Sequence, residues 1–154
     1  GNLSAEVSTY AVRGAKAAGA KVVFNPAPYQ AWCRSIAPGV DVLILNTVEH
    51  ERWSGAGDLG VPLAIVTCGP RGCLMKHGQE PAERFTAPHV NAKDATGAGD
   101  IFAGVFTASW GKNGDAAAST RLALAAASDS VTRPGAFASI PSRAEIERLR
   151  RELA

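Results

Sequence analysis

Residues 94–100 read Asp-Ala-Thr-Gly-Ala-Gly-Asp, and the apolar residues Ile-Phe-Ala-Gly follow directly at 101–104. The change from small residues to an apolar run predicts a turn that opens a helix. Backbone N–H groups at a helix start are free to face an anion, and the helix dipole adds partial positive charge. We expect Gly97, Ala98 and Gly99 to form such an anion site, with Asp100 beside it as a base for an incoming hydroxyl. Phosphoryl transfer from a nucleotide to an alcohol requires this combination.

Short apolar segments upstream of this turn predict the strands of a sheet. They cover residues 21–24, 41–45 and 63–67, and residues 73–76 read as the hairpin partner of the last of these. Within the segment 41–45 the run Val-Leu-Ile-Leu is apolar on both faces, as in a buried parallel strand. Residues 79–88 are expected to be irregular or edge-like.

Helical patterns alternate with the predicted strands. They cover residues 4–18, 29–36, 48–53, 97–110, 114–130 and 143–153. The alternation predicts an α/β fold with a mostly parallel sheet flanked by helices, in one domain over residues 1–154. Ligands of such sheets bind beyond the carboxyl ends of the strands, where Asn25, Asn46 and Thr67 stand.

The composition is typical of a folded protein without a broad charged surface. Hydrophobic residues make up 46% of the chain and charged residues 19%, which favours a packed core. The net charge is only +2, so we expect neither nucleic acid nor a membrane as a partner.

Cys33, Cys68 and Cys73 have no metal-like spacing and are expected to be free thiols of a reducing compartment. Because no signal pattern begins the sequence, the cytoplasm is the expected location.

Five motifs resemble those of the PfkB (ribokinase-like) carbohydrate kinase family. One is the turn at residues 94–100. The others are Asn-Pro-Ala-Pro at 25–28, Asn-x-x-Glu at 46–49, Thr-x-Gly-x-x-Gly at 67–72 and the loop at 130–141. They occur in family order and cover nearly the whole chain. The resemblance implies a Rossmann-like ribokinase fold and ATP-dependent phosphorylation of a sugar hydroxyl, with ribose as the leading substrate.

The resemblance gives the central motifs their roles. Asp100 is implied to be the catalytic base, and residues 97–99 are implied to be the anion hole for the transferring phosphoryl group. Asn46 and Glu49 are implied to position Mg²⁺ and the phosphates of ATP, partly through water. One glutamate suffices for this, because Mg²⁺ keeps several waters.

Five further positions are implied to border the nucleotide. Thr67, Gly69 and Gly72 would shape the adenine and ribose pocket by close backbone approach. Ala123 and Ala127 belong to an alanine-rich run that either borders the nucleotide or serves close helix packing.

The resemblance also implies a monovalent cation, such as K⁺, beside the anion hole. Most of its ligands would be carbonyl oxygens, so side-chain identity is weakly informative. The matching positions are Asp94, Thr96, Ser130, Arg133, Gly135 and Ser139.

Other interpretations stay open. The chain can be a non-catalytic nucleotide-binding or interaction module, or a PfkB kinase for fructose, a keto-deoxy sugar acid or a nucleoside. Glu49 can be a solvated surface acid, and Thr67 can simply end a strand. A dinucleotide oxidoreductase is disfavoured, since no Gly-x-Gly-x-x-Gly follows the first predicted strand.

The motifs match only the C-terminal, nucleotide-binding half of a PfkB kinase, without its lid. We expect such a chain to be a truncated, proteolysed or split protein and to be inactive alone, because nothing positions the acceptor hydroxyl. The strand at 21–24 would also lose a neighbour. Its open apolar edge predicts a homo-oligomer or pairing with another chain.

Overall fold

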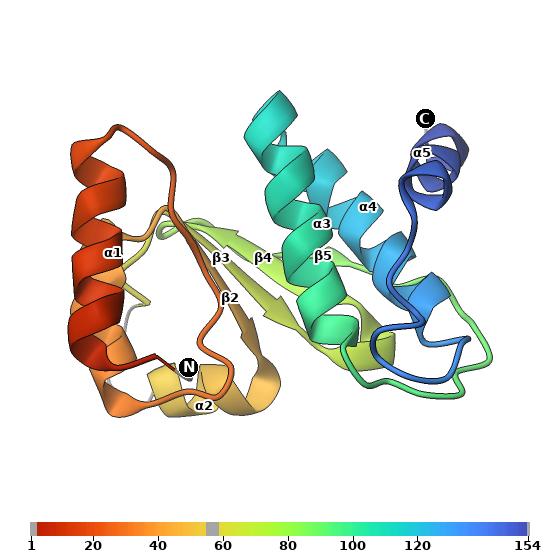
Figure 1. Cartoon of the computed structure of the whole chain (residues 1–154), viewed down its shortest axis with the longest axis horizontal. Coiled ribbons are helices and arrows are strands. Elements are labelled where there is room, and N and C mark those ends of the chain that lie inside the picture. The colour runs from red at the N-terminus through yellow and green to blue at the C-terminus, as the bar shows by residue number, and fades with distance from the viewer. Residues whose placement is uncertain (1–2, 55–58, 154) are drawn as a thin grey trace. The chain divides into compact units, whose positions relative to one another are not determined.

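The computed structural model describes residues 3–54 and 59–153 (Figure 1). Gly1, Asn2, residues 55–58 and Ala154 of the expected 1–154 domain lie outside the described residues. The chain forms two compact units. The first comprises Gly1–Cys68 and Cys73–Arg84, and the second comprises Gly69–Gly72 and Phe85–Ala154.

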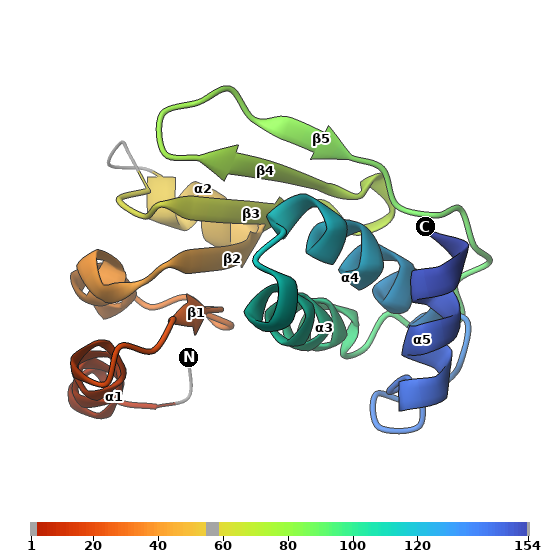
Figure 2. The same cartoon turned by 90° about the horizontal axis from the view of Figure 1, so that it is seen from above.

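The first unit holds most of a five-stranded sheet. Its elements are α1 (Ala5–Ala17), β1 (Val23–Phe24), the 3₁₀ helix η1 (Ala31–Gly39), β2 (Val42–Asn46), α2 (Thr47–Ser54), β3 (Leu63–Thr67), β4 (Cys73–His77) and the start of β5 (Glu83–Phe85). The strand order is β1-β2-β3-β4-β5, as Figure 2 shows from above. β1, β2 and β3 run parallel and β4 is antiparallel to β3, so the predicted α/β fold is confirmed.

Parallel pairing brings the carboxyl ends of β2 and β3 to one edge of the sheet. The register joins Val42 to Leu63 and Asn46 to Thr67. The first four residues of each strand are buried, and the last residue of each is at least partly exposed. The polar residues that end these strands therefore lie side by side, as expected for a ligand edge.

The core of the first unit includes Cys33, Leu43, Leu45 and Trp53, which are at most 1% exposed. Buried polar groups around Trp53 are satisfied. Its Nε1 donates to Leu59 O at 3.2 Å, and its carbonyl accepts from Arg34 Nη1 at 2.6 Å. These hydrogen bonds offset the cost of taking the polar groups out of water.

The second unit is helical. Its elements are the 3₁₀ turn η2 (Gly69–Arg71), α3 (Ala98–Asn113), α4 (Ala116–Ser130) and α5 (Arg143–Glu152). α3 and α4 lie side by side (Figures 1 and 2). Leu122, Ala125 and Ala126 of α4 pack with Ile101 and Leu149, and the small alanines allow close helix contact.

Helix starts in the second unit follow local capping chemistry. Gly97 precedes α3 with a φ of 80°, in the left-handed region that favours glycine. Asp115 caps α4 by accepting from the Ala118 N–H. Ser142 and Glu145 form a capping box at α5.

Two elements differ from the sequence prediction, and a third fits one of the two predicted alternatives. β1 is confined to Val23–Phe24, because the Val22 N–H donates to the Asp41 carboxylate at 2.8 Å instead of extending the ladder. The expected helix at 29–36 is a 3₁₀ helix that continues through Pro38 to Gly39. Residues 83–85, expected to be irregular or edge-like, form the short strand β5 at the edge of the sheet, of which only Phe85 is buried.

Candidate functional site

The turn at residues 94–100 opens α3 as predicted, but its N–H groups are not equivalent. The Ala98 N–H donates to Ala95 O at 3.2 Å and is engaged inside the turn. In the described part of the chain, the N–H groups of Gly97 and Gly99 have no protein partner. An anion at this turn would therefore be bound by Gly97 and Gly99, and the amide of Ala98 has a structural role.

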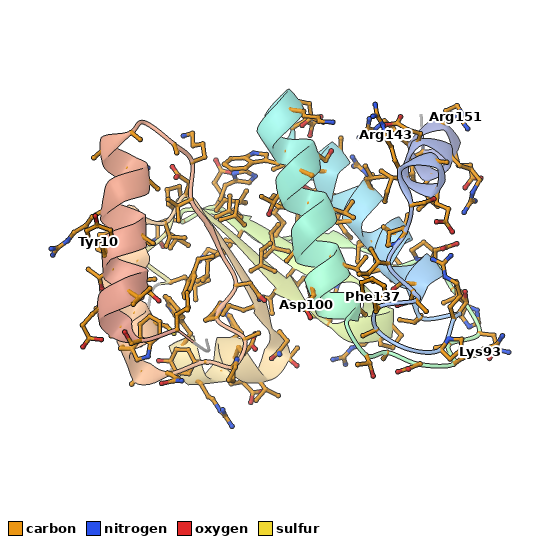
Figure 3. All side chains as sticks on the ribbon, in the orientation of Figure 1. Tyr10, Lys93, Asp100, Phe137, Arg143 and Arg151 are labelled. Carbon is orange, nitrogen blue, oxygen red and sulfur yellow. The ribbon has the colours of Figure 1, made fainter. Side chains whose placement is uncertain are left out.

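Asp100 lies in the first turn of α3 with its side chain exposed (Figure 3). It lines a cavity of about 480 Å³ between α3, the 136–141 loop and α5. The other lining side chains are apolar, among them Ile101, Phe137 and Ile140. Phe137 is 89% exposed, so a large apolar surface stands next to the carboxylate. The geometry leaves Asp100 accessible to an acceptor group, as a base requires.

Asp94 joins the turn to the loop after α4. Its Oδ1 accepts from the Thr96 N–H at 2.9 Å, and its Oδ2 accepts from the Gly135 N–H at 2.8 Å. The Thr96 hydroxyl, the Thr96 N–H and the Gly135 N–H lower the pKa of Asp94 to about 2. The ionised Asp94 side chain thus connects the 94–100 turn to the loop at Gly135, two segments that are far apart in the sequence.

The six positions implied to hold a monovalent cation form one cluster in the second unit. The Arg133 N–H donates to Ser130 O and the Ser139 N–H to Gly135 O, both at 3.1 Å. Ser130 and Ser139 are almost fully buried, and their hydroxyls donate to backbone carbonyls. The Arg133 guanidinium is ion-paired and cannot ligate a cation. Any cation here would depend on carbonyl and Asp94 oxygens.

Asn46 and Glu49 have a structural role that the sequence analysis missed. The Glu49 N–H donates to Asn46 Oδ1 at 2.8 Å, and the Asn46 N–H donates to Glu49 Oε2 at 2.9 Å. This is a capping box at the start of α2, and its Asn-x-x-Glu spacing was the available signal. Glu49 is 6% exposed, so the reading as a solvated surface acid is wrong. Its Oε1 has no hydrogen-bond partner in the described residues and stays available to a ligand.

Thr67 lies next to Asn46 at the end of β3, and its hydroxyl donates to Leu45 O at 3.2 Å. Asn25, beyond β1, similarly donates to Ile44 O at 2.8 Å. These strand-end side chains thus hold neighbouring strands together. Asn46, Glu49 and Thr67 form one group in the first unit, whereas Asp94, Asp100 and their neighbours form another in the second.

The positions in the second unit that are implied to border a nucleotide fall into two kinds. Gly72 has a φ of 89°, and a Cβ there would collide with the carbonyl of Phe85, so close backbone approach requires glycine. Gly69 has a φ of 57° with open space around it. Ala123 is fully buried and serves packing, while Ala127 keeps partial exposure.

No group of three or more His, Cys, Asp or Glu side chains in residues 3–54 and 59–153 is arranged to hold a metal ion. Across the same residues, none of the helices is both long and apolar enough for a bilayer. The cysteines of the described residues are free thiols, as expected.

Comparison with known proteins identifies the family. Residues 3–143 match the pfkB family carbohydrate kinases. The chain therefore belongs to this family.

Ribose and deoxyribose kinases are among its relatives. The chain is 34% identical to the deoxyribokinase of Salmonella typhi over 89% of its own length and 50% of that protein. It is 32% identical to the solved ribokinase of Thermotoga maritima, with a TM-score of 0.81 over 90% of this chain and 52% of that one. The Arabidopsis thaliana ribokinase solved with ribose and ATP shares the fold, with a TM-score of 0.83 at 23% identity, over 96% of this chain and 53% of that one. The chain spans about half the length of these relatives.

Proposed function

We propose that this chain carries the nucleotide-binding and base-bearing half of an ATP-dependent sugar kinase. The observation that carries the proposal is the exposed Asp100 directly after a turn with two free N–H groups. The N–H groups of Gly97 and Gly99 bind the transferring phosphoryl group, and Asp100 takes the proton of the acceptor hydroxyl. Ribose or a close pentose is the acceptor class, in line with the sugars of its relatives.

ATP and Mg²⁺ are the proposed cofactors. Glu49 would hold Mg²⁺ through Oε1 and water, because Oε2 is committed to the cap of α2. Asn46, Thr67, Gly69, Gly72 and Ala127 would contact the nucleotide. K⁺ would lie in the cluster of Asp94 and the 130–139 loop, held by oxygens of the backbone and of Asp94. Ala98 and Ala123 would support these sites through structure alone.

Calorimetry with ATP–Mg²⁺, combined with an assay of ADP release over a panel of sugars, tests this function. We expect weak ATP–Mg²⁺ binding by the 154-residue chain and little turnover, since positioning of the acceptor supplies about 7–11 kcal/mol of the barrier in such reactions. Absence of any nucleotide binding would contradict the proposal. Binding of ATP by the complete protein without turnover of any sugar would favour the alternative, a non-catalytic nucleotide-binding module.

The role of Asp100 has its own test. In the complete reading frame that contains this sequence, we expect Asp100→Asn to lower kcat by roughly 10²–10⁴ with little change in ATP affinity. Asp115→Asn is the matched control, because asparagine caps a helix as well as aspartate and only the charge changes. Equal activity of the two variants would remove Asp100 from the mechanism.

We also propose that the β1 side of the sheet pairs with another chain or another part of the kinase. β1 ends the strand order, and Val23 and Phe24 are only partly buried. Leu3, Val7 and Tyr10 are between 51% and 82% exposed around α1. An unpaired apolar edge associates readily. Sedimentation of the chain should show concentration-dependent dimers that Phe24→Lys abolishes, and a clean monomer at high concentration would contradict this.

A further inference from the structure

The guanidinium of Arg133 links three segments of the second unit. Its Nη1 donates to Glu145 at the start of α5, at 2.5 Å, and its Nη2 donates to Asp129 at the end of α4, at 2.9 Å. Nη2 also donates to Ser139 O at 3.2 Å. The side chain is 32% exposed, and its Nε is buried without a partner in the described residues. Arginine suits such a hub, because its planar fork holds several acceptors in fixed directions.

The contact with Ser139 fixes the loop between α4 and α5. Within that loop, the Ser139 N–H donates to Gly135 O at 3.1 Å, and the Ser139 hydroxyl donates to Ala136 O at 3.0 Å. Ser139 is 2% exposed. The loop is therefore closed on itself and tied at Ser139 to the helix ends through Arg133.

The same loop supports the turn that opens α3. The Gly135 N–H donates to Asp94 Oδ2 at 2.8 Å, and Asp94 holds the Thr96 N–H with its other oxygen. Ala136 packs directly behind Gly97, where a Cβ on Gly97 would lie 3.2 Å from the Ala136 methyl group. Because packed groups do not deform independently, a displaced 135–139 loop displaces the turn.

We infer that Arg133 is a positioning residue for the Gly97–Asp100 turn, acting through Ser139, Gly135 and Asp94. The inference rests on the proposed function for its catalytic meaning, since the turn carries the anion-binding N–H groups and the base. Arg133 touches neither the nucleotide nor the acceptor in this scheme. It fixes the spacing between Gly97, Gly99 and Asp100.

Arg148 offers a matched control on the same charge network. It donates to the other oxygen of Asp129 at 3.3 Å and to Glu152 at 2.9 Å. No hydrogen bond or ion pair joins its side chain to the 135–139 loop in the described part of the chain. Arg148→Met therefore removes ion pairs and a positive charge but leaves the loop anchor at Ser139 in place.

The test compares Arg133→Met, Arg133→Lys and Arg148→Met by amide NMR of the 154-residue chain. We expect Arg133→Met to shift the amide resonances of Gly97 and Gly99, and to speed hydrogen exchange of the Gly135 amide by about tenfold or more as local opening becomes easier. Lysine keeps the charge without the fork, so Arg133→Lys should restore only part of this protection. Arg148→Met should leave all three amides unchanged.

Two results would overturn the inference. One is equal effects of Arg133→Met and Arg148→Met on these amides. The other is an unchanged Gly135 exchange rate in Arg133→Lys and Arg133→Met alike. If Arg133→Met does not fold, Arg133→Lys carries the comparison, and normal Gly97 and Gly99 resonances in that variant reject the positioning role.

Titration with inorganic phosphate separates this inference from the proposed function. In the wild type we expect phosphate to shift the Gly97 and Gly99 amides, with an apparent Kd at least about threefold higher in Arg133→Met. If phosphate does not shift the Gly97 and Gly99 amides of the wild type, the proposed anion site is wrong. The exchange data still decide whether Arg133 positions the turn.

Discussion

Asn46 and Glu49 hydrogen-bond each other's backbone, with the Glu49 N–H donating to Asn46 Oδ1 at 2.8 Å and the Asn46 N–H donating to Glu49 Oε2 at 2.9 Å. A motif implied to bind Mg²⁺ and phosphate is thus also the cap of α2. The two roles are compatible, because a capping carboxylate has a second oxygen. They make different predictions for substitutions.

Glu49→Gln and Glu49→Ala separate capping from charge. Glutamine can still accept a hydrogen bond from the Asn46 N–H, so we expect the stability of Glu49→Gln to stay close to wild type. Glu49→Ala should lose about 1 kcal/mol of unfolding free energy. Both variants should weaken Mg²⁺-dependent ATP binding. Urea denaturation and calorimetry measure the two effects. Glu51→Gln, on the same helix and exposed, is the control, and a loss of ATP binding there would point to bulk charge instead of a specific ligand.

Gly72→Ala should be far more damaging than Gly69→Ala. Both residues have positive φ, which costs alanine about 1–2 kcal/mol, but only at Gly72 would the Cβ collide with the Phe85 carbonyl. We expect Gly72→Ala to lose several kcal/mol more unfolding free energy than Gly69→Ala, or to prevent folding, because the colliding atoms belong to the backbone. Urea unfolding curves give the difference. Equal losses of unfolding free energy in the two variants would contradict this, because they would show that the backbone around Phe85 moves to accommodate the Cβ at little cost.

The Glu145 carboxylate should make stability fall in acid. The Ser142 hydroxyl, the Ser142 N–H and Arg133 lower its pKa from the usual 4.5 to about 2. Because the folded pKa lies below the unfolded one, this stabilisation is complete above about pH 4.5 and is lost as the pH falls towards 2. Urea midpoints of wild type and Glu145→Gln should therefore differ at pH 6 and converge near pH 2. Glu147→Gln, in an exposed pair with Arg150, should show no such convergence.

Cys68 should be the reactive thiol of the native chain. Burial raises the pKa of Cys73 to about 12, and Cys33 is fully buried, whereas Cys68 is partly exposed. Iodoacetamide at pH 8 should therefore label Cys68 first, because only the thiolate reacts. Mass spectrometry of peptides from native and urea-treated protein maps the labels. Native labelling of Cys73 at the rate of Cys68 would contradict the observed burial.

Much of the fold was predictable because its signals are local. The apolar runs at 42–45 and 63–66 predict buried strands, and Ser4, Asp115 and Ser142 mark helix starts by the side-chain chemistry that caps N–H groups. The start of β1 was mispredicted, and β5 was predicted only as irregular or edge-like, because the extent of both strands depends on their partners. The Asp41 carboxylate accepts the Val22 N–H, so β1 begins only at Val23. Pairing within the sheet forms β5.

By itself the sequence determined the order of strands and helices, the family motifs and the glycine that begins α3, because each depends on neighbours along the chain. Only the tertiary structure decided that Asp94 accepts from the Gly135 N–H and that Arg133 links Ser139 and Glu145. Hydrogen bonds between segments form only after the backbone has brought donors and acceptors within about 3 Å. No spacing along one segment encodes that distance.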